Sequence, residues 1–133
     1  MANALRFLDE CMQREVIIDI KPGSDPNGLN PRSRGLIPVA ILTTSLADGD
    51  PLDFDATNVD PLSLAFGPAG AGIAHATGHV QDVDGDGDLD LVVHFRTEDA
   101  GIACGDTTAT LTGMTFGGQP FEGVDSVFTA GCK

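Results

Sequence analysis

The sequence predicts an all-β domain, an immunoglobulin-like or related β-sandwich of about seven short strands. From Val16 onward, short alternating or wholly apolar runs are separated by Gly, Pro, Asn and Asp, which are turn residues. The chain has 133 residues, of which 41% are hydrophobic, and this suits one domain with its own core. A second domain would be hard to fit.

Each predicted strand is a run of apolar or β-branched residues with turn residues at both ends. The stretch 22–31 is predicted as a loop, because its prolines lack backbone donors and its glycines favour special dihedral angles. The acidic stretch 48–55 is predicted as a further turn. The strands are expected near residues 16–21, 36–43, 62–66, 73–80, 88–96, 107–113 and 121–129.

Residues 1–15 differ from the β domain at 16–133 and are treated as a separate segment. Leu5, Leu8, Cys11 and Met12 recur at helical spacing among charged and polar neighbours. A short amphipathic helix is therefore predicted. Its apolar stripe would dock either on the domain that follows, which is the simpler expectation, or on another molecule.

The most specific motif is a run of carboxylates around two glycines in residues 82–90. Calcium loops take their ligands from positions 1, 3, 5, 7 and 9 and turn sharply at a glycine in position 6, which is Gly87 here. Carboxylates this close repel one another unless a cation lies among them, so bound Ca²⁺ is predicted rather than a solvated acidic turn. The predicted ligands are Asp82, Asp84, Asp86, Asp88 and Asp90.

The loop departs from an EF-hand, because position 12, where a bidentate Glu would complete the shell, is Val93. The residues from Leu89 to Phe95 alternate like a strand, so no second helix is expected. In these respects the loop resembles the calcium loops of integrin-type propellers and thrombospondin repeats. That resemblance implies a carbonyl ligand from Asp88 and side-chain ligands from Asp82, Asp84, Asp86 and Asp90.

The charge restricts the partners. A net charge of −13 and a pI near 4.1 exclude the basic surface of a nucleic-acid binder and disfavour attraction to an anionic membrane. The sequence also has no apolar run long enough to insert into a membrane. A second candidate calcium site, for which the irregular spacing and Pro51 favour a plain solvated turn instead, consists of Asp48, Asp50, Asp53 and Asp55.

Two of the three cysteines, Cys104 and Cys132, bracket the last two predicted strands and are predicted to form a disulfide. Cys11 would then be unpaired within the chain; the alternative is three reduced thiols in a cytosolic protein. A weak calcium loop needs millimolar calcium, which is an extracellular condition, so the domain is expected outside the cell or on its surface. Since no secretory signal is visible, we expect either a signal peptide that was removed or a piece of a larger exported protein.

The three histidines are the alternative metal ligands, because imidazole is a common ligand of transition metals. If His75 and His79 lie on one continuous strand, they are about 13 Å apart at roughly 3.3 Å per residue, too far for one ion. If that strand pairs with the strand of His94, then His75 faces His94 and His79 faces Asp90, where it would orient a calcium ligand. Surface or hydrogen-bonded histidines are the default expectation.

Several separate motifs occur in order: IDIKPGS at 18–24, PN at 26–27, the run at 30–44, the Asp loop followed by HFRT at 94–97, and CGDT at 104–107. Together they resemble an uncharacterised domain family found in secreted multidomain proteins of bacteria and archaea. The likeness covers about residues 16–133 and implies an exported, calcium-loaded β domain. Residues 1–15 and the long link between Thr44 and Phe54 depart from the family's usual pattern.

The sequence contains no nucleophile elbow, zinc-protease motif or phosphate-binding glycine motif, so no enzyme is expected. The predicted function is that of a calcium-stabilised structural or adhesive module. One alternative is calcium-dependent carbohydrate binding, which the lack of Trp and Tyr disfavours. The other is self-assembly through the apolar stripe of residues 5–12 and Cys11. The expected partners are calcium, the chain itself, and other surface proteins or glycans.

Overall fold

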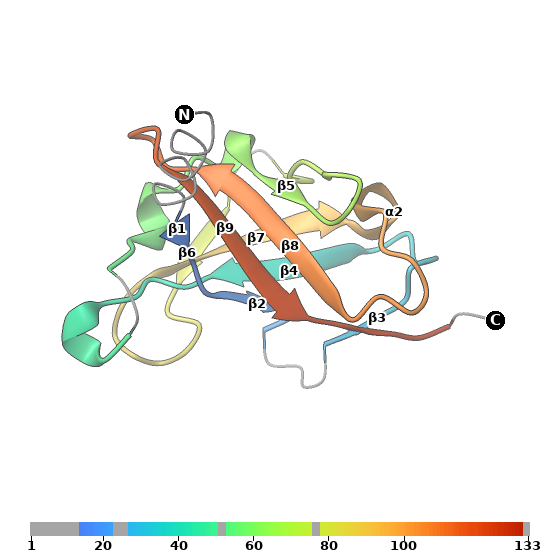
Figure 1. Ribbon diagram of the computed structural model, residues 1–133, viewed down its shortest axis with the longest axis horizontal. Coiled ribbons are helices and arrows are strands. Elements are labelled where there is room, and N and C mark those ends of the chain that lie inside the picture. The colour runs from blue at the N-terminus through green and yellow to red at the C-terminus, as the bar shows by residue number, and fades with distance from the viewer. Residues whose placement is uncertain (1–13, 23–26, 51–52, 76–77, 132–133) are drawn as a thin grey trace, which may run out of the picture.

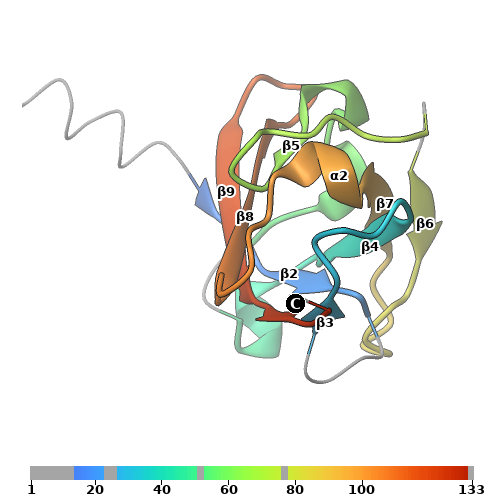
Figure 2. The ribbon, with the colours of Figure 1, turned by 90° about the vertical axis from the view of Figure 1, so that its right-hand side faces the viewer.

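Two four-stranded sheets lie face to face in the computed structural model, which describes residues 14–22, 27–50, 53–75 and 78–131. Figure 1 shows strands β8 and β9 crossing in front of β4 and β7, and Figure 2 shows the two layers from the side. A small parallel pair, β3 with β10, adds a third sheet. This arrangement confirms the predicted all-β sandwich.

The strands are short, as the sequence predicts. The first sheet has the order β1 (Arg14–Glu15), β9 (Pro120–Ser126), β8 (Thr108–Met114) and β5 (Ala65–Phe66). The second has the order β2 (Ile18–Ile20), β4 (Leu36–Ile41), β7 (Asp90–Arg96) and β6 (His79–Gln81). The third pairs β3 (Gly28–Leu29) with β10 (Phe128–Thr129). One-turn helices connect them: η1 (Leu46–Asp48), η2 (Ala56–Asn58), η3 (Pro61–Ser63) and α2 (Thr97–Ala100).

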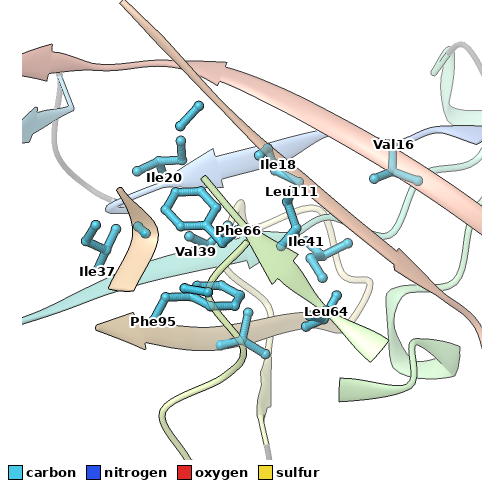
Figure 3. Close-up of a cluster of buried hydrophobic side chains, with 14 of the residues drawn as sticks. Val16, Ile18, Ile20, Ile37, Val39, Ile41, Leu64, Phe66, Phe95 and Leu111 are labelled. Atoms are coloured by element: carbon cyan, nitrogen blue, oxygen red, sulfur yellow. The ribbon is translucent and has the colours of Figure 1, made fainter. Parts of the chain in front are cut away.

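The core lies between the two large sheets, because each strand turns every second side chain inward. On β7, Leu91, Val93 and Phe95 are buried with at most 4% of their surface exposed. Phe95 stacks on Phe66 of the opposite sheet, with ring centroids 5.0 Å apart, and Figure 3 shows both rings among the aliphatic side chains. Such aromatic pairs add about 0.5–1.5 kcal/mol beyond the apolar area that they bury.

The chain crosses from one sheet to the other at its first strands. The Val16 N–H donates to the Glu122 carbonyl of β9, and the next carbonyl, of Ile17, accepts from Leu42 beside β4. The crossing brings the backbone close to Gly123, where an added Cβ would lie 2.6 Å from the Ile18 Cγ2 atom. The segment from β1 to β2 therefore pairs with both sheets and ties them together.

Three predicted strands differ from the structure. The predicted strand 121–129 is divided between β9 and β10, which belong to different sheets. Residues 73–80 are not one strand: Ile73 forms an isolated bridge with Phe95, and β6 begins only at His79. Within 62–66 only β5 pairs as a strand, because Pro61 starts the short helix η3 and the Asp60 side chain caps it by accepting from the Leu62 N–H.

The predicted amphipathic helix falls mostly on residues 1–13, which lie outside the described residues. Arg14 and Glu15, also assigned to that segment, form strand β1 and pair with Phe121 and Glu122. The β domain thus includes these two residues as well. No helix in the described ranges is long and apolar enough to cross a membrane.

Candidate metal centre

The Asp loop connects β6 to β7 at one end of the second sheet (Figure 2). Gly85 and Gly87 have φ of 74° and 91°, the left-handed region that glycine adopts without a steric penalty. These two positions let the backbone turn twice within a few residues. The turns direct alternate side chains toward a common centre, as the calcium-loop pattern predicts.

Four of the five predicted ligands come together. One carboxylate oxygen from each of them lies within 4.8 Å of the others, and no other group of His, Cys, Asp and Glu in the described part of the chain meets this spacing. Three of the four side chains are exposed, so an ion could enter from solvent. The four residues are Asp82, Asp84, Asp86 and Asp90.

Backbone N–H groups of the loop donate hydrogen bonds to all four of these carboxylates. The two oxygens of Asp82 each accept a hydrogen bond of 2.9 Å, from the N–H groups of Gly85 and Gly87. Asp86 Oδ1 accepts from the Asp88 N–H at 2.9 Å. The loop is therefore folded around its carboxylates by its own main chain.

Asp90 anchors the loop to the sandwich. Its side chain is fully buried, with 0% exposed. Oδ1 accepts from the Thr43 N–H at 2.8 Å and Oδ2 from the Val83 N–H at 2.9 Å. Charged acceptors make stronger hydrogen bonds than neutral ones, and a buried carboxylate needs such partners.

Thr43 holds the end of the loop from the neighbouring strand segment. Besides its N–H, its hydroxyl donates to the Leu89 carbonyl at 2.6 Å and accepts from the Ala56 N–H at 2.9 Å. One residue thus connects the end of the Asp loop to the start of η2. No short-range sequence motif marks this role.

The pKa of one carboxylate of the loop, that of Asp84, is raised. Desolvation, followed by a side-chain hydrogen bond to Asp86 and the charge of Asp90, raises the pKa of Asp84 from 3.8 to about 6. A divalent cation would reverse this effect, because an opposite charge stabilises the ionised form.

Asp88, the remaining predicted ligand, is not among the four converging carboxylates and is half-buried. Its implied contribution is a carbonyl oxygen, which stays a prediction.

Carboxylates of the second candidate calcium site accept local hydrogen bonds within turns. Asp50 accepts from the Ser45 N–H, Asp53 from the Leu46 N–H, and Asp55 caps η2 by accepting from the Thr57 N–H. A second ion here stays a prediction. The side chain of the fourth member, Asp48, is outside the described residues.

The histidines are arranged differently from the prediction. His79 pairs with Val92, and the residue opposite Asp90 is Gln81, so His79 does not face the predicted calcium ligand. His75 and His79 nevertheless both contact His94, with ring centroids 5.7 Å and 5.9 Å from its ring. Burial lowers the pKa of His94 below 6.5, and the charges of His75 and His79 lower it further.

Cys104 is exposed in a turn that lies beside β10, because the Gly105 N–H donates to Thr129 Oγ1 at 2.9 Å. Cys132 and Cys11 are outside the described residues. The disulfide between Cys104 and Cys132 therefore stays a prediction.

The chain matches no protein-family model and no curated protein sequence. Among solved structures it is similar to AggA, the major subunit of aggregative adherence fimbriae type I from Escherichia coli. The sequences are 14% identical, the match covers 86% of this chain and 94% of that one, and the TM-score is 0.29. A TM-score this low carries no argument about function.

Proposed function

We propose that this chain is a calcium-stabilised, non-catalytic β module that serves as a structural or adhesive part of an exported protein. The observation that supports this function is the convergence of four carboxylates within 4.8 Å at one hairpin turn. Hard oxygen ligands in a flexible loop suit Ca²⁺ better than Mg²⁺ or a transition metal.

The position of the loop favours a stabilising role for the ion. Asp90 belongs to the central strand β7, and Thr43 joins the loop to the segment after β4. An ion bound by Asp90 and by the exposed Asp82, Asp84 and Asp86 would fasten the β6–β7 turn to the sheet. Since the site requires the folded chain, calcium binding adds to the free energy of unfolding.

The proposed location outside the cell is based on the calcium supply. Loops without a closing Glu resemble extracellular modules, whose dissociation constants are about 10⁻⁴–10⁻³ M. Such a site would be filled outside the cell and largely empty in cytosol. The likeness of the sequence motifs to a secreted domain family supports the same location.

Thermal unfolding in calcium and in EDTA tests the proposal. At a calcium concentration about 100 times the dissociation constant, the ion adds about 2.7 kcal/mol. For a domain of this size that corresponds to a midpoint about 10 °C higher. An identical midpoint in calcium and in EDTA would contradict the proposal.

Two variants that each remove one negative charge make the test specific. Asp86→Asn removes an exposed carboxylate from the loop and should reduce the calcium-induced shift. Asp99→Asn changes an exposed carboxylate in α2, outside the loop, and should keep the whole shift. Equal behaviour of the two variants would show that calcium acts through the overall negative charge of the protein rather than through this loop.

A further inference from the structure

All three histidines of the chain gather on one surface, on the outward side of the β6–β7 edge. His94 lies on β7 and is half-buried, whereas His75 and His79 are exposed. Both exposed rings stand at steep angles to the His94 ring, 71° for His75 and 81° for His79. The rings approach from two sides of His94.

An irregular edge strand brings them together. The Ala74 N–H bonds to the His94 carbonyl, while His79 pairs with Val92. Five residue steps along the edge, from 74 to 79, thus correspond to two steps along β7, from 94 to 92. The edge therefore has three more residues than β7 over this stretch. As a result, His75 and His79 both contact His94, which they could not do on a continuous strand.

The surroundings leave the imidazole nitrogens available. On the outward side of the sheet the cross-strand neighbours are apolar: Pro38 lies opposite His94, and Ala40 lies opposite Val92. None of the three imidazoles makes a hydrogen bond within the part of the chain that the structure describes.

We propose that His75, His79 and His94 bind one divalent transition-metal ion, with Zn²⁺ as the best-suited metal. Imidazole nitrogens are borderline ligands that prefer zinc and its neighbours to calcium. Three histidines leave the fourth tetrahedral position to water, as in zinc sites that remain open to solvent.

The ring separations are slightly longer than those around a bound ion. Zinc holds imidazole nitrogens at about 2.0–2.1 Å, which in a tetrahedral shell puts two ring centroids roughly 5 Å apart. The measured separations are 5.7 Å and 5.9 Å. The nitrogens do not converge within 4.8 Å as the Asp carboxylates do, so the rings must turn to close the shell. His75 and His79 are exposed, and rotation between staggered rotamers is open to them.

This site is separate from the Asp loop. His94 is four residues beyond Asp90 on β7, or about 13 Å at roughly 3.3 Å per residue. The ligands divide by chemistry: oxygens at the loop bind calcium and nitrogens on the outward surface bind zinc. Failure of either site leaves the other intact.

The test is a zinc titration of the full chain with ¹⁵N-labelled histidines in about 5 mM CaCl₂, which keeps a millimolar calcium site filled. One equivalent of zinc should shift the imidazole ¹⁵N resonances of all three histidines together. His75→Ala and His79→Ala should each weaken zinc binding about 100-fold, since even indirect partners of metal ligands contribute 10–100-fold. Gln81→Ala, an exposed neighbour on β6, is the matched control and should bind zinc normally.

Three outcomes would overturn the proposal. Imidazole resonances that do not respond to stoichiometric zinc show that the histidines are not ligands. Zinc binding that survives His79→Ala and is lost only on Cys11→Ser assigns the metal to a thiol. Equal loss of affinity in the histidine variants and in Gln81→Ala shows a general effect on the fold, which thermal midpoints measured in EDTA would reveal independently.

Discussion

Replacing Thr43 by valine removes a hydroxyl that makes two hydrogen bonds while keeping the volume of the side chain. The Ala56 N–H loses its acceptor at 2.9 Å in a residue that is 0% exposed, so water does not readily replace it. The Leu89 carbonyl loses its donor at 2.6 Å, but Leu89 is 53% exposed and water can take over. Since one buried group left unsatisfied costs about 1–3 kcal/mol, we expect a loss of about 2 kcal/mol.

Urea unfolding in EDTA measures this loss without a contribution from calcium. Thermal unfolding should show a midpoint lower by about 6–10 °C for a domain of this size. Thr43→Ser keeps the hydroxyl and is the matched control, with a loss well below that of valine. If valine and serine at position 43 are equally stable, the hydroxyl does not hold the loop end and our account of Thr43 is wrong.

Gly123→Ala should cost about 1–3 kcal/mol, because the added methyl overpacks the crossing between the sheets, whereas Gly72→Ala, which meets nothing within 4 Å, should be close to neutral in the same unfolding assay. Asp84 has its folded-state pKa raised to about 6, so calcium-free protein loses stability as the pH rises from about 4 to about 6. Asp84→Asn should abolish that loss, and its midpoint should therefore exceed that of the wild type at pH 7 and equal it below pH 4; the opposite order would refute the assignment. Asp125→Ala should cost about 2 kcal/mol by urea unfolding, because the Ile20 N–H loses its acceptor at 2.9 Å, and Asp125→Asn, which keeps one oxygen, should cost less.

The sandwich could be predicted because its main strands carry their own periodicity. Leu91, Val93 and Phe95 alternate with outward residues, and such a pattern shows which side is buried. The two-residue strands could not be predicted in this way, since two residues show no period. Strands β3 and β10 exist because their backbones meet in parallel when the sheets pack, which is a tertiary effect.

The convergence of the Asp loop carboxylates could be predicted because they are neighbours in sequence, so their spacing alone specifies the geometry. The anchoring of Asp90 could not, because Thr43 is 47 residues away. The contact of both His75 and His79 with His94 could not be predicted for another reason. The 13 Å separation assumes a continuous strand, whereas the edge carries surplus residues before His79, so His75 and His79 both reach His94.

The alternation of β7 would let the two proposed metal sites share one hairpin without disturbing the core. Its inward residues pack between the sheets, and its outward residues become steadily more accessible along the strand: Asp90 is 0% exposed, Val92 is 8% exposed, and His94 is half-buried. A carboxylate at the closed end needs fixed hydrogen-bond donors, and the N–H groups of Thr43 and Val83 supply them to Asp90. An imidazole at the open end meets solvent directly, so an ion there exchanges without unfolding. Because both proposed sites need the folded chain, each ion should raise the free energy of unfolding by an amount set by its concentration relative to its dissociation constant.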